Sequence, residues 1–478
     1  MATTGTKVAH DARKSLRRTS SLVEQAGRTA HEQSKARRQE GKAMRRTVPH
    51  DAHSQYALSS KRPDPIALLQ SQDAVRIQSL VPVRFGRMAA SPFSFYRGAA
   101  IVMANDLATT PTTGWLAQAC GDAHLENFGG FGTEEGSLVF DVNDFDETYP
   151  APWEWDLKRL AASAVLALRE LGAKSSDHRA AAGAAATGYR TAVQYLADMG
   201  VMARWSAAVD VPEAMALMGS SKSQIDKAAA AALKRTNVGA FPKLTELVDG
   251  RREIKEKPPL VVRITDDAEL QTAQQGFASY RETLRPELRL LVDRFSFVDF
   301  ARKVVGVGSV GMPAYVGLGL TADNDPLFLQ IKRAVESVLK PFVAVDGPPA
   351  HEGERVVVGQ RLLQVAGDPL LGWTTSGGDQ HFYVRQLRDM KLSFDVTAMK
   401  PSQVVKYVDL CAQVLARSHS RTGDPALIAG YLGSSDKSAA FDGAIADFAT
   451  AYADQTERDH AALKQAIKDG RVEAQSGI

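Results

Sequence analysis

Residues 120–129, Cys-Gly-Asp-Ala-His-Leu-Glu-Asn-Phe-Gly, form the densest run of side chains that could do chemistry. Asp122, His124, Glu126 and Asn127 stand within six positions of this run. A carboxylate and a carboxamide supply the hard oxygen ligands that Mg²⁺ takes, and a separate aspartate can accept the proton of a hydroxyl group. We therefore regard Asp122, His124 and Asn127 as candidate catalytic residues, although bracing the loop is the more ordinary role for His124.

A second acidic run follows in residues 138–147, Leu-Val-Phe-Asp-Val-Asn-Asp-Phe-Asp-Glu. The apolar residues at its start predict a strand that delivers Asp141, Asp144 and Asp146 to its end. Taken with the first run, this pattern indicates a phosphoryl-transfer site in which one aspartate is the base and other side chains bind metal. The predicted metal ligands are Asn127, Asp144 and Asp146.

Two other interpretations of these runs remain open. Asp and Asn side chains are frequent in turns, where they cap their own backbone, and for any single residue this is the more ordinary role. A zinc site could use Asp122, His124 and Asp144. Catalytic zinc, however, normally takes three protein ligands dominated by histidine, and no second histidine stands four residues after His124.

Residues 306–311, Gly-Val-Gly-Ser-Val-Gly, are a glycine-rich motif that is a weak signal by itself. A dinucleotide-binding fold needs a helix that starts inside such a motif, whereas here Pro313 and a strand-like run over residues 314–321 follow. Two strands joined by a glycine loop are the arrangement with which kinases cover nucleotide phosphates. The predicted nucleotide-binding residues of this loop are Gly306, Gly308, Ser309 and Gly311.

Lys332 ends a run, Leu-Phe-Leu-Gln-Ile-Lys, that predicts another strand. An ammonium group at this place can hold the α- and β-phosphates of ATP. Arg385, in the strand predicted over residues 381–387, is a further candidate for nucleotide binding. The acidic partner of Lys332 is left open among three candidates: Glu336, Glu352 and Glu354. The more ordinary alternatives are a flexible hairpin for the glycines and solvent-exposed positions for Lys332 and for arginines such as Arg84, Arg87 and Arg97.

Three motifs within residues 121–161 resemble those of a known group of enzymes. Gly-Asp-Ala-His-Leu-Glu-Asn, then Asn-Asp-Phe-Asp-Glu, then Pro-Trp-Glu-Trp-Asp-Leu-Lys-Arg-Leu-Ala are similar, in this order, to motifs of aminoglycoside phosphotransferases and choline-type kinases. The resemblance implies a role for each matched residue: Asp122 as the catalytic base, Asn127 and Asp144 as metal ligands, and Asp156 as the helix residue that braces the catalytic loop.

Over a longer stretch, from about residue 45 to the end, the chain resembles a bacterial family of unknown function, the one numbered 2252. Four motifs carry this resemblance: Phe-Tyr-Arg-Gly at 95–98, Cys-Gly-Asp-Ala-His at 120–124, Asn-Asp-Phe-Asp-Glu-Thr at 143–148, and Tyr-Val-Arg-Gln-Leu-Arg-Asp-Met-Lys at 383–391. This second resemblance implies no substrate.

The elements that must position these residues indicate a mixed α+β protein. We expect a basic, mostly flexible arm over residues 1–60, a catalytic-loop region with a helical large lobe over 61–300, a strand-rich small lobe over 301–395, and C-terminal helices over 396–478 that pack on the large lobe. Kinases place the glycine loop before the catalytic loop, and here the order is reversed. The expected fold is therefore two-lobed and protein-kinase-like (aminoglycoside phosphotransferase-like), in a circularly permuted form.

The composition limits the class of protein. The chain of 478 residues is 44% hydrophobic and 24% charged, which excludes a collagen-like or wholly disordered chain. Its net charge of +3 is unevenly divided, because residues 1–50 carry 12 Lys and Arg against 4 Asp and Glu, so that the remainder is mildly acidic. The basic arm could bind nucleic acid or another acidic partner, but no aromatic residues stand among its basic ones to stack on bases.

Cysteine usage and hydropathy bear on the compartment. The two cysteines, Cys120 and Cys411, cannot form a disulfide framework or a four-cysteine zinc site. No stretch approaches the roughly 18–20 apolar residues of a membrane span, and no apolar region follows the basic N-terminus as in a secretory signal. We expect a cytoplasmic protein without a membrane partner.

The function predicted from these patterns is transfer of phosphate from ATP, with Mg²⁺, to a hydroxyl group of a small-molecule acceptor. Two alternatives would use the same residues, namely transfer of AMP in place of phosphate, and a regulatory protein that binds nucleotide without catalysis. A nucleic-acid binder acting through the basic arm is a further alternative of a different class.

Overall fold

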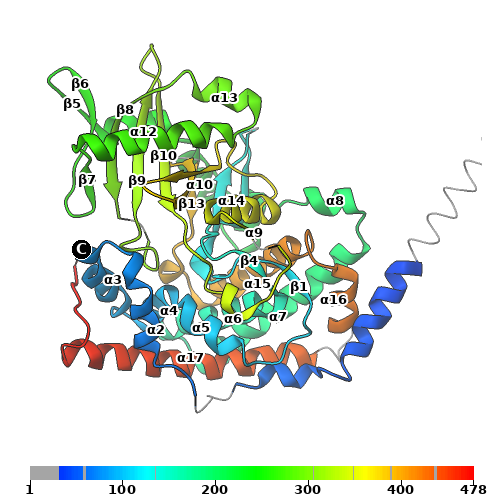
Figure 1. Cartoon of the computed structure of the whole chain (residues 1–478). Helices are drawn as coiled ribbons and strands as arrows, with labels where there is room; N and C mark the ends of the chain where they lie inside the picture. The colour runs from blue at the N-terminus through cyan, green and yellow to red at the C-terminus, as the bar shows by residue number, and fades with distance from the viewer. Residues whose placement is uncertain are drawn as a thin grey trace, which may run out of the picture.

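The structure is a computed structural model that describes residues 32–56, 61–134, 136–304, 306–347, 349–387, 390–434 and 439–477. These residues form an α+β protein, as predicted. A six-stranded sheet stands at one end, a body of long helices at the other, and two small sheets lie between them (Figure 1).

The six-stranded sheet is antiparallel throughout, in the order β11–β12–β10–β9–β8–β7. Lys332 of β10 pairs directly with Tyr383 of β12, so their side chains leave the same face of the sheet. Ile331 and Val384 leave the other face and pack against α12 (Asp267–Glu282). The strands are β7 (Val261–Arg263), β8 (Ser296–Lys303), β9 (Ala314–Leu320), β10 (Pro326–Arg333), β11 (Gly372–Ser376) and β12 (Gln380–Gln386).

The helical body consists of α6 (Trp153–Glu170), α7 (Ser175–Asp198), α15 (Pro401–His419), α16 (Pro425–Leu432) and α17 (Ala439–Lys468). Helix α7 contacts each of the other four. Every residue of α6 from Trp153 to Leu168 is buried, because this helix is covered on all sides by its neighbours. Its polar residues must therefore find partners inside the protein.

Shorter helices complete the described chain. Ser91 begins α4 in the manner expected of a helix cap, because its hydroxyl accepts a hydrogen bond from the amide of Ser94 and Pro92 occupies the first turn. The shorter helices are α2 (Pro65–Ser71), α3 (Val81–Met88), α4 (Pro92–Gly98), α5 (Ala100–Leu107), α8 (Val201–Ser206), α9 (Val211–Leu217), α10 (Lys222–Leu233), α11 (Asn237–Leu244), α13 (Pro286–Val292) and α14 (Glu352–Leu363).

Two small sheets position the candidate catalytic segments. Strand β1 (Leu116–Ala119) pairs with β4 (Tyr149–Pro152), and β2 (Phe128–Gly132) pairs with β3 (Leu138–Val142) and with the short β13 (Leu392–Ser393). The first acidic run follows β1, and the second contains β3 and continues past its end. The sequence thus correctly predicted this strand, and Asp144 and Asp146 lie past its end, but Asp141 lies within β3 and is buried.

The boundary expected at residue 300 is wrong for the strand-rich part of the chain. Strand β7 precedes this boundary and belongs to the large sheet, and helices α12 and α13 precede it and pack against that sheet. A hairpin of β5 (Thr245–Val248) and β6 (Arg251–Ile254) packs beside β8. Strand β8 ends at Lys303, and a loop follows.

The flexible arm expected over residues 1–60 is also too long. Residues 32–44 form a helix against α16, and η1 (His50–Ser54) packs on α17. Arg45 donates to the carbonyl oxygens of Gly430 and Tyr431, and the buried His53 ring lies 2.7 Å (Nε2) from the Tyr431 hydroxyl. This polar segment is ordered because α16 supplies partners for its side chains.

The proposed binding of an acidic partner by residues 1–50 falls largely outside the described residues, which begin at residue 32. Within the described part, several of the arginines already have partners in this chain. Arg37 pairs with Glu40 and Asp424, and Arg38 pairs with Asp198. Across the residues that the structure describes, no helix has both the length and the apolar character that crossing a bilayer requires.

Gly41 allows a test of whether residues 32–44 belong to the folded protein. A Cβ atom at Gly41 would collide with the backbone of Leu427 in α16, whereas one at Gly183 of α7 would meet nothing. We expect Gly41→Ala to lower the free energy of unfolding by about 1–3 kcal/mol and Gly183→Ala to raise it by roughly 0.5–1 kcal/mol. Denaturant titration measures both, and equal stability of Gly41→Ala and wild type would contradict the packing described here.

Candidate active site

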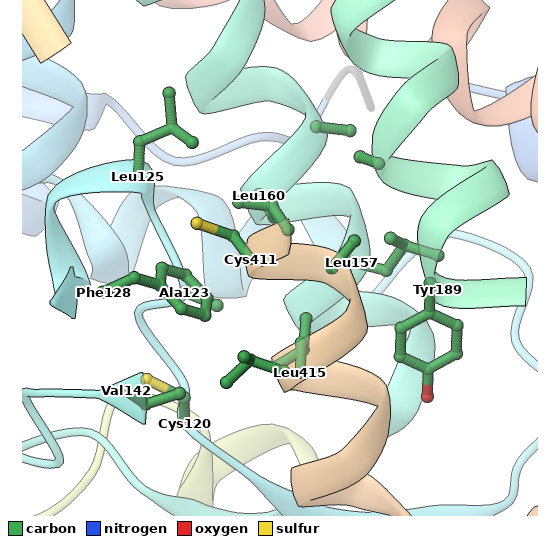
Figure 2. Packing of buried hydrophobic residues seen from close by; sticks show 14 of the residues in the cluster. Cys120, Ala123, Leu125, Phe128, Val142, Leu157, Leu160, Tyr189, Cys411 and Leu415 are labelled. Carbon is green, nitrogen blue, oxygen red and sulfur yellow. The ribbon is translucent and has the colours of Figure 1, made fainter. Parts of the chain in front are cut away.

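The candidate catalytic loop, residues 120–128, is fixed by alternation of apolar and polar side chains. Its apolar residues are at most 1% exposed and lie in the core between the loop, α6 and α15, as Figure 2 shows for Cys120, Ala123, Leu125 and Phe128 beside Leu157, Leu160, Cys411 and Leu415. Burial of these residues directs the intervening side chains out of the core. The polar residues Asp122, His124 and Asn127 consequently line a pocket.

Asp156 of α6 braces the loop, as the resemblance implied. Its two carboxylate oxygens accept hydrogen bonds from the backbone amides of Cys120 at 2.7 Å and Gly121 at 3.0 Å. The buried His419 ring lies 3.2 Å (Nε2) from the same carboxylate, and its Nδ1 lies 2.9 Å from the Tyr189 hydroxyl. A chain of buried groups from α7 and α15 therefore holds Asp156 in position, and through it the candidate catalytic loop.

Arg159 was not predicted from the sequence and makes the closest contact to Asp122. It stands one helical turn after Asp156, and both its Nε and its Nη2 reach Oδ1 of Asp122, with the Nε distance at 2.5 Å. Its Nη2 also donates to the carbonyl oxygen of Tyr96. Burial raises the pKa of the Asp122 carboxyl to about 6, although the Arg159 charge opposes that rise. The spacing of Asp156 and Arg159 along one helix face was the available signal.

His124 is a buried, neutral side chain beside this pair. Burial lowers the pKa of its imidazole well below the ordinary value, and the charges of Arg97 and Arg159 lower it further. Its Nε2 lies 3.8 Å from Oδ2 of Asp122, and its Nδ1 has no hydrogen-bond partner. The structure thus places His124 next to the predicted base, where a catalytic role stays a prediction.

Asn127 and Asp144 provide the oxygen atoms that a hard cation would need. The side-chain amide nitrogen of Asn127 donates to the carbonyl oxygen of Asp122 at 2.6 Å, so the amide oxygen is the atom left for a ligand. Asp144 follows β3, and its Oδ1 accepts from the amide of Asp146 at 3.2 Å. Both side chains line the same pocket as Asp122.

Asp146 binds three donors at once. Its carboxylate receives Lys332 Nζ at 2.6 Å, the Tyr383 hydroxyl at 2.7 Å and the Ser309 hydroxyl at 3.1 Å. Burial by itself would raise the pKa of Asp146, but Lys332 holds it below the ordinary value. Burial likewise would lower the pKa of Lys332, but the carboxylates of Asp144 and Asp146 raise it. These donors occupy the oxygens of Asp146, which leaves Asn127 and Asp144 as the better placed metal ligands.

The acidic partner of Lys332 is thus none of the three candidates from the sequence. Glu336 pairs with Lys340 at 2.6 Å, and Glu352 pairs with Arg355 at 2.5 Å. Among the described residues, Lys332 makes no ion pair with either of these or with Glu354. Glu336 was a candidate because it is near in sequence, and Glu352 and Glu354 because a helix could begin there, but the partner is a residue 186 positions away.

Arg355 holds α14 on the segment that carries the two aspartates. Its guanidinium group donates to the carbonyl oxygens of Thr148 at 2.6 Å, Asp146 at 2.9 Å and Val335 at 2.8 Å. The side chain is 3% exposed. This arginine was not singled out in the sequence, because nothing in a local pattern shows that a helix residue will receive distant carbonyl groups.

The glycine motif joins β8 to β9 as the loop of a hairpin, as expected. Gly306 and Gly311 have φ angles of +68° and +84°, a conformation that favours glycine. A Cβ atom at Gly308 would approach the carbonyl oxygen of Arg97 to 3.2 Å, and the Gly311 carbonyl oxygen accepts from the amide of Ile77 at 2.8 Å. The loop is therefore held against α4 and the segment that precedes α3.

These segments enclose one pocket of about 500 Å³. The predicted residues that line it are Asp122, His124, Asn127, Asp144, Asp146, Gly306, Gly308 and Ser309. Gly311 and Lys332 do not line it, but Lys332 reaches it through Asp146. Arg385 lines a different pocket of about 270 Å³, and it donates to Gln330 and, at 3.4 Å, to the carbonyl oxygen of Asn143 beside Asp144. The larger pocket, of about 500 Å³, is also lined by Arg76, Glu147 and Arg333, which the sequence did not single out.

Two observations bear on a metal ion. No three side chains of His, Cys, Asp and Glu come together as a metal site within the described ranges, and the zinc site considered from Asp122, His124 and Asp144 is not seen there. A magnesium ion needs fewer protein ligands, because it keeps several waters and substrate phosphates. One carboxylate and one amide oxygen in a shared pocket, as Asp144 and Asn127 offer, suit that requirement.

Comparison with known proteins identifies the family. Residues 76–466 match the family described as "Uncharacterized protein conserved in bacteria (DUF2252)". The chain belongs to this family. No curated protein and no solved structure matches the chain significantly. The matched span includes every residue that lines the pocket except Ser71, Gln72 and Val75.

The Lys332–Asp146 pair can be measured by a double-mutant cycle. We expect Lys332→Met to lower the free energy of unfolding by about 2–4 kcal/mol. This is less than for a fully buried pair, because 28% of the Asp146 side chain is exposed. Adding Asp146→Asn to Lys332→Met should recover part of that loss, since the uncompensated charge is then removed. Strictly additive effects in denaturant titrations would show that the two side chains do not interact.

Proposed function

We propose that the protein is an ATP- and Mg²⁺-dependent phosphotransferase that phosphorylates a hydroxyl group of a small-molecule acceptor. The observation that carries this proposal is that two neighbouring acidic segments and a glycine loop far away in the chain line one pocket. They are the catalytic loop with Asp122 and Asn127, the segment after β3 with Asp144, and the glycine loop. A base, two oxygen ligands and a phosphate-covering loop are the parts that phosphoryl transfer requires.

Asp122 would act as the general base. Arg159 holds its Oδ1, which leaves Oδ2 to accept a proton from the acceptor hydroxyl. The acceptor oxygen then forms a bond to the γ-phosphorus of ATP as the bond from that phosphorus to the bridging oxygen of ADP breaks. The proton stays on Asp122 until it passes to solvent, and ADP leaves with the electron pair of the broken bond.

Asn127 and Asp144 would hold Mg²⁺ through the amide oxygen and the carboxylate. When bound, Mg²⁺ would offset negative charge on the β- and γ-phosphates. Lys332 would supply positive charge behind Asp146, since its ammonium group contacts that carboxylate and does not itself line the pocket. The backbone amides of residues 306–309 would cover the phosphates. A side chain at Gly308 would come too close to the backbone of Arg97.

We further propose that the architecture is a two-lobed, kinase-like fold in circularly permuted form. The six-stranded sheet would form the smaller of the two lobes. It carries the glycine hairpin β8–β9 and Lys332 on β10, and helix α14 follows β10 in the chain. The chain would return from β12 to the large lobe through β13, which pairs with β2 of the catalytic segment. One difference from the resembled enzymes is that Asp146, and not a glutamate of α14, is the partner of Lys332.

Nucleotide and metal binding give the first test. We expect ATP with Mg²⁺ to raise the Tm of the full-length protein by several degrees, and either component alone to have a smaller effect, since each supplies charges that offset the other. Asp144→Asn should abolish the effect of Mg²⁺. The control Asp325→Asn removes the same charge at an exposed position and should leave that effect unchanged. The absence of any shift with ATP or GTP and Mg²⁺ would overturn the proposal.

The role of Asp122 gives the second test. We expect Asp122→Asn to reduce kcat by about 100- to 10,000-fold, because the amide cannot accept the proton. For the wild type, kcat/KM should fall tenfold per pH unit below about 6, since the carboxyl group is protonated there and loses its basicity. Asp325→Asn is again the control. A flat profile between about pH 5 and 7, or full activity of Asp122→Asn, would refute the base assignment.

The product of the reaction separates the alternatives that use the same residues. The mass of the product shows whether phosphate or AMP has been transferred to the acceptor. Nucleotide binding without turnover of any acceptor or of ATP itself would indicate a regulatory protein instead.

A further inference from the structure

Arg76 is a buried cation on the wall of the pocket, and its closest carboxylate is engaged elsewhere. Its side chain is 9% exposed, and its Nη1 donates to the carbonyl oxygen of Val310 in the glycine loop at 2.5 Å. Nε of Arg76 lies 3.9 Å from Asp73 and has no hydrogen-bond partner. The same carboxylate oxygen of Asp73 accepts from Arg84 at 2.9 Å.

Burying a guanidinium group without a paired anion is costly. Burial lowers the pKa of Arg76, and the carboxylates of Asp73, Glu147 and Asp146 only partly oppose this. Because Nη1 donates to Val310, the edge of the guanidinium group that Nε and Nη2 form is the one left for a ligand. Two parallel N–H donors on that edge are the geometry that binds a carboxylate or phosphate group through two hydrogen bonds.

Arg84 shows what a structural arginine looks like in the same segment. It is fully buried, and it donates to Asp73, to the carbonyl oxygen of Leu69 and to the side chain of Gln72. It does not line the pocket. Because Arg84 already pairs with Asp73, Arg76 is not needed to compensate that carboxylate. Arg76 therefore differs from Arg84 in that it lines the pocket.

Arg97 of α4 adds a second guanidinium group to this wall. Its Nη2 pairs with Glu126 at 2.6 Å, and its buried Nε has no hydrogen-bond partner. Arg97 lies on the side of the pocket where the predicted base stands, since its charge acts on both Asp122 and His124. A ligand that reaches Arg97 is therefore also near the base.

We propose that Arg76 and Arg97 form an oxyanion-binding subsite that holds a phosphate or carboxylate group of the acceptor. This inference rests on the proposed function, and it names the acceptor class as hydroxyl compounds that also carry an acidic group. Gly308 and Gly311 shape the subsite, because their missing side chains let the glycine loop lie against the Arg97 backbone and the Arg76 side chain.

Calorimetric titration of the full-length protein with inorganic phosphate tests the subsite. We expect Arg76→Gln to weaken phosphate binding by about tenfold or more, since two charge-assisted hydrogen bonds are lost. Arg302→Gln, which removes a 43% exposed cation of β8, is the control of equal charge and should bind as wild type does. If Arg76→Gln does not fold, Arg97→Gln provides the same comparison from a side chain that is 23% exposed.

A second titration, in saturating ATP and Mg²⁺, distinguishes the source of the anion. Phosphate that still binds, with the same dependence on Arg76, supports an acceptor subsite. Competition between phosphate and ATP would assign Arg76 to the nucleotide phosphates and overturn the acceptor assignment. Equal phosphate binding by wild type and Arg76→Gln would overturn the subsite itself. Phosphate binding through Arg76 in a protein that does not bind ATP would leave the subsite standing and refute the proposed function.

Discussion

The carboxylate of Asp146 is the contact on which the arrangement of the pocket depends. It receives Lys332 and Tyr383 from the large sheet and Ser309 from the glycine loop, while its backbone carbonyl receives Arg355 of α14. A single residue in the segment after β3 thus binds both the large sheet and helix α14 beside it. Because each donor compensates a carboxylate side chain that is only 28% exposed, removing one donor would leave part of its charge unpaired.

Buried ion pairs hold the other strand ends to the helical body in the same way. Asp122 is bound by Arg159 of α6, and Asp141 by Arg417 of α15 and by the amide of Val365. Asp141 belongs to the acidic run that suggested a catalytic site, but it lies inside the protein at 1% exposure. The acidic residues of that run therefore divide into one that stabilises the fold and others that face the pocket.

The parts of the site that could be predicted are those in which local pattern and chemistry coincide. Asp122, Asn127 and Asp144, which line the pocket, were singled out because oxygen donors are concentrated in a few positions of the sequence. The strand before Asp144 was predicted from three apolar residues. Arg159 and Arg76 were missed, since an arginine has the same local signature whether it pairs with solvent or with a buried carboxylate. Only the packing of α6 beside the catalytic loop separates these cases.

The sequence by itself determined the α+β class, the glycine hairpin and the residues that could do chemistry, because periodicity and residue type act over a few positions. Tertiary structure decided which helices cover the large sheet, that residues 32–44 pack on α16, and that Lys332 pairs with Asp146 and not with a nearby glutamate. The physical reason is that burial and charge pairing are set by surfaces that meet across long distances in the chain. A local sequence pattern does not show which distant residues will pack against it.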